Sequence, residues 1–472
     1  MTSLLRRKTI PAAHELPEHH RLARTMTWPH LMAMGVGAIV GTGILTLIGV
    51  GADRAGPAVL WSFVVAGVIC ACAALAYAEM ATTIPASGSA YTYSYAVLGE
   101  VFAWVVGWSL ILEYSLVVST VAVGWSGYAN GFLTGLGIHL PDVLTHGPTV
   151  AAGKITSFGI NLPAVFIIAV VAALLARGTH ESARVNSALV VLKLVTLALF
   201  VAVAAPHFDP ANLQPFAPHG YGSTPGEGGV KYGMLGAAAI IFFAFYGFDA
   251  ISTAAEETRN PDRDLPIAIV GSMAVCTLIY IVVAAAAVGA VHYTEFGKSD
   301  EPLALILRTI GSPTVATIVA GAAVIALPTV ILAFLYGQSR IFMVMARDGF
   351  LPESLARVSA RGVPARITSV TAIFVALLAA ALPLDLIASL ANAGTLCAFI
   401  AVAACVLVMR RRAPDAKRAF STPLAWLVCP FAIVGCIYLF TGLQAITQKS
   451  FFVWNAVGLL IYFFYARRRS LA

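Results

Sequence analysis

Long apolar segments alternate with short polar ones along almost the whole chain. Twelve of the apolar segments approach or exceed the roughly 20 residues that a helix needs to cross a bilayer. They fall near residues 31–50, 58–82, 101–130, 161–176, 185–205, 232–258, 265–291, 311–346, 364–382, 385–408, 423–443 and 450–466. The pattern predicts an all-α polytopic membrane protein with twelve transmembrane helices.

Two of these segments contain residues that interrupt helices. The first holds Gly-Val-Gly-Ala-Ile-Val-Gly-Thr-Gly at 35–43, and the sixth places Gly247 among aromatic residues before Asp249. Irregular backbone at membrane depth is tolerated only where it is buried in protein or lines a cavity. Two interrupted helices at corresponding places in two halves are typical of a secondary transporter's substrate site. We therefore expect helices 1 and 6 to be broken beside a substrate.

The twelve segments divide into two blocks of five and a remainder. The blocks are residues 31–205 and 232–408, and because five is odd the second block enters the membrane from the opposite side. This predicts two inverted repeats, although no strong residue identity relates them apart from the two breaks. Residues 1–30 are expected to form a cytoplasmic N-terminal segment, and residues 423–466 to form two additional transmembrane helices.

Composition and charge exclude other classes of protein. The chain is 59% hydrophobic and 11% charged, whereas soluble domains carry about 25% charged residues. If the N-terminus is cytoplasmic, 22 of the 29 Lys and Arg residues fall in cytoplasmic segments. This is the positive-inside rule, so the net charge of +7 indicates topology and not nucleic-acid binding. Both termini are therefore expected in the cytoplasm.

The glycines of the first break favour local unwinding, because each costs about 1 kcal/mol relative to Ala in a helix. An unwound turn exposes N–H groups at the start of the following half-helix, where a carboxylate is favoured. The alternative is close helix packing at the Gly37 and Gly41 pair. In the sixth segment, freed carbonyls of Phe243, Ala244 and Phe245 can accept bonds from an ammonium group. Asp249 either joins that site or caps the following half-helix.

Three further ionisable residues lie within segments. Lys193 in the fifth is the only basic residue well inside a segment, and we expect it either to exchange a proton during a conformational cycle or to remain a permanently charged structural residue. Glu113 in the third segment either lines the cavity or pairs locally. Glu79, near the inner end of the second segment, is expected to face an aqueous vestibule.

Several stretches resemble the amino acid–polyamine–organocation superfamily, and within it the cationic amino acid transporter family in its bacterial form. The matching stretches are residues 35–44, 87–95, 181–186 leading into Lys193, 243–261, 336–340 and 347–352. The resemblance implies a LeuT-type fold of 5+5 inverted repeats with two extra helices, in a bacterial inner (plasma) membrane. It also implies proton-coupled amino acid symport and not sodium-driven uptake.

The resemblance places the substrate between the two breaks. It implies that the carboxylate meets the backbone around Ile39, Thr42 and Gly43, and that the amine meets Ile39 and carbonyls near Phe243 and Tyr246. It also implies that Lys193 takes the place that sodium holds in related folds. The expected substrate-binding residues are Ile39, Val40, Gly41, Thr42, Gly43, Phe243, Ala244, Phe245, Tyr246, Asp249, Glu113 and Leu327.

The resemblance also implies that the eighth segment partly sets the side-chain pocket, and Leu327 looks like the matching residue. Leu offers no charge partner, so small or medium neutral amino acids such as alanine are favoured. Glu113 favours the alternative of arginine or lysine, and an amino acid or polyamine exchanger is a further alternative. We expect no enzyme, because no metal, cofactor or nucleophile constellation appears. The expected partners are an amino acid, protons and the lipid bilayer, without nucleic acid; the sequence does not indicate an accessory subunit.

Overall fold

The structure is a computed structural model of the 472-residue chain. It describes residues 6–7, 26–86, 88–147, 149–151, 154–176, 183–226, 229–255, 258–355 and 365–467. Most of the expected N-terminal segment lies outside these ranges, as do residues 87, 181–182 and 256–257 of the stretches that carry the family resemblance.

Helices form almost all of the described chain, because each apolar segment must satisfy its own backbone groups within lipid. The first half contains α1 Trp28–Ile39, α2 Thr42–Leu45, α3 Leu47–Ala55, α4 Val59–Thr83, α5 Ser89–Val97, α6 Glu100–Gly135, α7 Asp142–Thr145, α8 Leu162–Ala176 and α9 Ala183–Ala204. The second half contains α10 Met234–Ile241, α11 Phe248–Thr253, α12 Pro261–Ala290, α13 Pro302–Thr309, α14 Pro313–Ala326, α15 Pro328–Arg347, α16 Ala365–Ala381, α17 Leu384–Arg412, α18 Ala425–Gly442 and α19 Ala445–Ile461. Two short antiparallel hairpins, β1 Thr149–Ala151 with β2 Lys154–Ser157 and β3 Thr224–Pro225 with β4 Lys231–Tyr232, lie in connecting loops.

The helices form a membrane-sized bundle. Ten helical stretches of the described chain are long and apolar enough to span a bilayer. Two shorter apolar helices, Leu162–Ala176 and Arg366–Ala381, lie where the fourth and ninth predicted spans fall. The all-α polytopic class is confirmed, while the count of twelve crossings stays a prediction.

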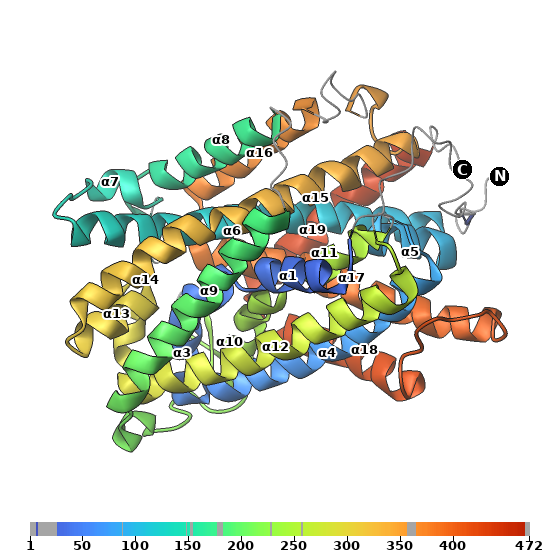
Figure 1. Ribbon diagram of the computed structural model, residues 1–472. Helices are drawn as coiled ribbons and strands as arrows, with labels where there is room; N and C mark the ends of the chain where they lie inside the picture. The colour runs from blue at the N-terminus through green and yellow to red at the C-terminus, as the bar shows by residue number, and fades with distance from the viewer. Residues whose placement is uncertain are drawn as a thin grey trace.

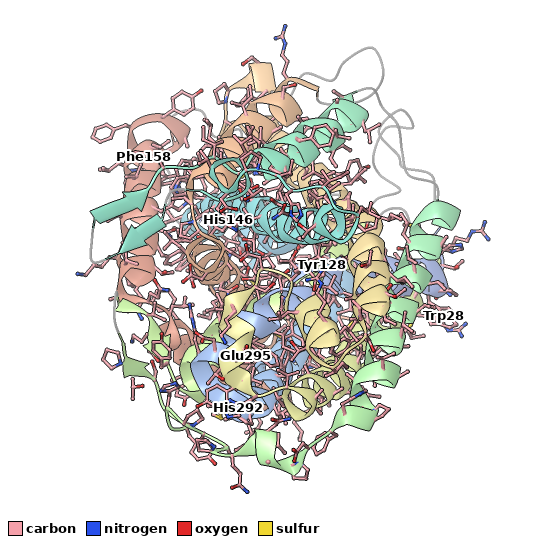
Figure 2. All side chains as sticks on the ribbon, turned by 90° about the vertical axis from the view of Figure 1, so that its left-hand side faces the viewer. Trp28, Tyr128, His146, Phe158, His292 and Glu295 are labelled. Atoms are coloured by element: carbon pink, nitrogen blue, oxygen red, sulfur yellow. The ribbon has the colours of Figure 1, made fainter. Side chains whose placement is uncertain are left out.

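The central elements are short and buried. Figure 1 shows α1 and α11 in the middle of the bundle, between a layer containing α6 and α15 and a layer containing α4 and α12. Helix α5 lies at one end, which we call the terminal face. Helices α7 and α13 lie at the opposite end, which we call the distal face and which Figure 2 views directly.

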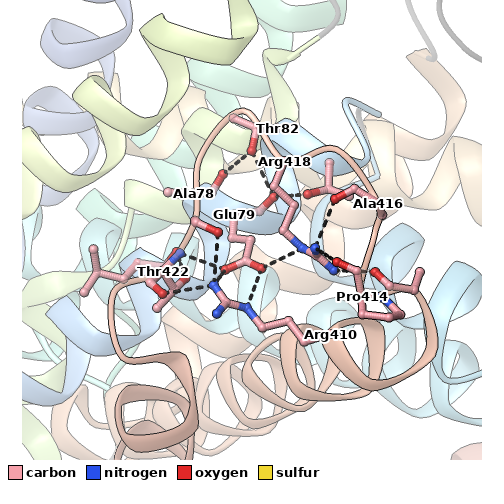
Figure 3. Close-up of polar contacts among 12 residues, drawn as sticks. Ala78, Glu79, Thr82, Arg410, Pro414, Ala416, Arg418 and Thr422 are labelled. Carbon is pink, nitrogen blue, oxygen red and sulfur yellow. Dashed lines mark hydrogen bonds and ion pairs between the residues drawn. The ribbon is translucent and has the colours of Figure 1, made fainter.

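At the terminal face, Glu79 of α4 is buried in a cluster of polar contacts (Figure 3). Its carboxylate accepts hydrogen bonds from Nε and Nη2 of Arg410 at 3.0 and 2.7 Å and from the Thr422 N–H at 2.8 Å, and Nε of Arg418 lies 3.4 Å away. The expectation that Glu79 faces water is therefore wrong. A buried carboxylate needs such partners to offset its lost hydration, and here they tie α4 to the end of α17 and the following loop.

Candidate functional site

The first helix break lies between α1 and α2. Helix α1 ends at Ile39, Val40 is extended with ψ 98°, and α2 begins at Thr42 after Gly41. The first N–H groups of α2 have no carbonyl one turn earlier in the same helix. The Thr42 hydroxyl is also buried, and Oγ1 has no hydrogen-bond partner among the described residues. This break therefore presents polar groups that a ligand can bond.

The second break lies between α10 and α11. A short 3₁₀ turn, Phe242–Phe245, follows α10, and Tyr246 is extended with ψ 152°. Gly247 then has φ +115°, a left-handed value that glycine adopts without the strain of a side chain. The helix resumes at Phe248 with a new start, so the sixth predicted segment is interrupted where Gly247 indicated.

The two breaks are in direct contact through glycines. A Cβ atom added to Gly43 would lie 2.2 Å from Cα of Ala244, and one added to Gly247 would lie 2.7 Å from Cβ of Ala38. Glycine is thus required on each break for close approach to the other. The hydroxyl of Tyr280 on α12 lies 2.7 Å from the Ile39 carbonyl and 3.0 Å from the Ala244 carbonyl, and can donate to one of them at a time.

Asp249 holds the start of α11. Its Oδ1 accepts a hydrogen bond from the Gly247 N–H at 3.2 Å, and its Oδ2 accepts one from the Tyr114 hydroxyl of α6 at 3.2 Å. The side chain is 3% exposed. The contact with Gly247 supports the capping alternative, because it satisfies a backbone donor at the start of the half-helix.

Asn392 of α17 completes the second break, and sequence reasoning missed it. Its Nδ2 donates to the carbonyls of Ala239 at 2.6 Å and Ile240 at 3.3 Å, and its Oδ1 accepts from the Tyr246 hydroxyl. A fully buried Asn in an apolar segment is itself a signal, because an amide at membrane depth needs partners. Tyr280 was also missed, and a tyrosine within a span gives no comparable signal.

Lys193 joins α9 to the first break. Its side chain is 3% exposed, and Nζ donates a hydrogen bond to the Gly37 carbonyl at 2.7 Å. In an uninterrupted helix that carbonyl would accept from the N–H of residue 41. Because α1 ends at Ile39, the carbonyl is freed, and a cation is favoured at the negative end of the helix dipole. The position of Lys193 thus follows from the break.

Glu113 and Leu327 are the other two predicted side chains, and both are buried. Glu113 of α6 is 1% exposed and packs against α17, where a Cβ on Gly394 would lie 3.0 Å from Cβ of Glu113. Its Oε2 has no hydrogen-bond partner among the described residues. Leu327 is fully buried at the start of α15, and Val330 of the same helix lies against Gly41 of the first break. A Cβ on Gly41 would lie 3.3 Å from Cγ2 of Val330.

Comparisons with known proteins agree with this architecture. Residues 26–465 match the family model described as amino acid permease. The chain is 46% identical to the branched-chain amino acid permease BcaP of Bacillus subtilis (strain 168), over 93% of this chain and 92% of that protein. It is 39% identical to the methylthioribose transporter of the same strain, over 100% and 99% of the two chains. It is 34% identical to the vacuolar cationic amino acid transporter 4 of Arabidopsis thaliana, over 88% and 68%.

Proposed function

Because the chain belongs to the amino acid permease family of multi-pass membrane transporters, we propose that it is a proton-coupled amino acid symporter that works by alternating access. The chain is a transporter and not an enzyme, and amino acid transport is its general activity. One observation carries the finer proposal. The two breaks touch each other, and the first still presents a buried, unpartnered Thr42 hydroxyl.

A zwitterion suits the electrostatics of the first break. The start of α2 is the positive end of a helix dipole and favours a carboxylate, which the Thr42 hydroxyl can also bond. The end of α1 is a negative end and favours an ammonium group at the Ile39 carbonyl. The carbonyls of Phe243 and Ala244 face Tyr246 N–H and the Tyr280 hydroxyl, and each retains a second lone pair for the amine.

The side chains beside the proposed substrate site favour a substrate with a neutral side chain. Leu327, Val330 and Phe243 are buried and apolar, so a guanidinium placed against them would lose its hydration without a replacement. We therefore favour small or medium neutral amino acids such as alanine, and the branched-chain permease similarity supports a neutral substrate. Glu113 favours the second candidate, arginine or lysine, because its free oxygen could meet a cation through water.

Lys193 is the proposed proton-coupling residue. Its ammonium group bonds the last turn of α1, so loss of the proton would remove the charge that holds α9 to this end of the break. Substrate binding next to that turn would then shift the balance between conformations through its differential affinity for them. We place the terminal face in the cytoplasm of a bacterial inner membrane, on the distribution of Lys and Arg.

The test is uptake into proteoliposomes made from the purified chain. Labelled alanine, valine and arginine are supplied with and without an inward proton gradient and an uncoupler. We expect the gradient to drive accumulation of alanine and valine and the uncoupler to abolish it. Exchange without net accumulation would favour the exchanger, and preferred uptake of arginine would favour the second candidate.

The Lys193→Ala variant tests the coupling residue. It should lose gradient-driven accumulation and retain exchange of internal for external substrate, because the seat at the breaks remains. Lys193→Arg serves as the control that keeps the charge and the bond to Gly37. Unchanged accumulation by Lys193→Ala would remove Lys193 from the mechanism.

A further inference from the structure

An apolar groove outside the substrate site runs down the lipid-facing surface from the distal face. It lies where α14 packs against α6 and α9 (Figure 1).

The groove between α6, α9 and α14 has a volume of about 780 Å³. Its lining includes Phe132 and Gly135 of α6, Leu192 of α9, Arg308 of α13, and Gly321 and Ala322 of α14.

Glycines let α6 and α14 approach each other closely at the floor of the groove. A Cβ on Gly135 would lie 2.9 Å from Oγ1 of Thr317, and one on Gly321 would lie 2.9 Å from Cε2 of Phe132. A larger residue at either position would press on the facing helix, so α6 and α14 form a continuous floor. The rim is open to lipid, because Ile318 is 55% exposed and Ile325 is 61% exposed on a membrane-spanning helix.

The length of the groove decides between two kinds of occupant. It follows α14 from Pro313 to Ile325, which is about 18 Å at 1.5 Å per residue. The hydrocarbon core of a bilayer is about 30 Å thick, so one leaflet is about 15 Å. A partner's transmembrane helix would contact a surface across both leaflets, whereas a single acyl chain matches one leaflet.

The distal end of the groove carries a cation. Nη1 of Arg308 donates to Oε1 of Glu301, whose carboxylate fits against Gly131 of α6. Glu301 is 8% exposed and Arg308 is 34% exposed, so the positive partner is the outer one. We propose that the groove binds one acyl chain of an anionic phospholipid, with the headgroup phosphate at Arg308. The site is separate from the substrate seat.

The acyl-chain seat is tested by native mass spectrometry of the purified full chain, titrated with dioleoyl phosphatidylglycerol. We expect one lipid to be held more tightly than the rest. Ala322→Leu should weaken binding of that first lipid at least tenfold by filling the groove. Ala376→Leu, at a half-buried alanine of α16, is the matched control and should bind as the unaltered chain does. Equal binding by Ala322→Leu would overturn the proposal.

The headgroup seat is tested by comparing phosphatidylglycerol with phosphatidylcholine carrying the same chains. The unaltered chain should prefer the anionic lipid roughly fivefold, the factor for one cation near the membrane surface. A double Glu301→Gln and Arg308→Gln variant leaves no buried unpaired charge and should lose the preference while still binding phosphatidylcholine. Arg308→Lys should keep it. A preference that survives the double substitution would overturn the assignment to Arg308. Neither readout requires transport.

Discussion

The two helix breaks differ in how many of their polar groups form hydrogen bonds within the protein. At the second, Asp249 bonds the Gly247 N–H, and Asn392 bonds two carbonyls at the end of α10. At the first, the Thr42 hydroxyl is buried without a partner among the described residues. Side chains thus bond both a backbone donor and backbone acceptors at the second break, whereas the first keeps a buried hydroxyl that the proposed substrate would bond.

The largest expected effect follows from removing the contact between the breaks. Gly247→Ala places a Cβ 2.7 Å from Cβ of Ala38 and also forces a non-glycine residue to φ +115°. Strain of this kind costs about 1–3 kcal/mol, and overpacking adds a similar amount. We expect a loss of stability of about 3 kcal/mol or more, and loss of transport, measured by thermal unfolding and proteoliposome uptake.

Gly137→Ala is the matched control for that variant. Gly137 has φ +83° and no atom within 4 Å of an added Cβ, so it carries the backbone strain without the overlap. We expect it to cost about 1 kcal/mol and to leave transport intact. If the two variants lose equal stability, the contact between the breaks is not what demands glycine.

Asn392→Leu should destabilise the second break. The substitution removes the donor to the Ala239 and Ile240 carbonyls and the acceptor for the Tyr246 hydroxyl. Unsatisfied buried groups cost about 1–3 kcal/mol each, although shared carbonyls lose less. We expect a loss of stability of about 2–3 kcal/mol in thermal unfolding. Stability that is unchanged would show that Asn392 does not hold this break.

Thr42→Val, at the first break, should affect substrate binding and leave stability almost unchanged. The hydroxyl has no partner to lose, so stability should change by less than about 0.5 kcal/mol. If the hydroxyl donates to the substrate carboxylate, its loss should raise KM about tenfold, since a bond to a charged group contributes about 1.5 kcal/mol or more. A stability loss with unchanged KM would reverse the assigned roles of the two breaks.

Local sequence predicted where the helices break, because glycine and polar residues stand out in apolar segments. It could not predict which side chains satisfy them. Asn392 and Tyr280 reach the breaks from helices far along the chain, and Glu79 meets Arg410 331 positions away. No local pattern encodes such pairings. Leu327 and Val330 lie within one helical turn, so which of them faces Gly41 depends on the orientation of α15 about its own axis.

The smallest expected effect on stability comes from an exposed ion pair at the distal face, away from both breaks. Nε2 of His146 lies 3.0 Å from Oδ2 of Asp300, and both side chains are about half exposed (52% and 51%; Figure 2 shows His146). The hydrogen bond to Asp300 raises the pKa of His146 above 6.5, against the opposing effect of burial, and Asp142 adds to the rise. The stabilisation is therefore present in full below pH 6.5 and is lost as pH rises through the raised value.

The stabilisation by the His146–Asp300 pair should stay below about 1 kcal/mol, because exposed ion pairs contribute little. We expect His146→Gln to lower Tm by about 1–2 °C near pH 5.5 and to leave it unchanged near pH 8.5. Lys298→Gln breaks an exposed pair with Glu295 that contains no histidine, so its effect on Tm should be the same at both pH values. A His146→Gln deficit that grows with pH would contradict the proposed pairing, because the neutral imidazole would then be the stabilising form.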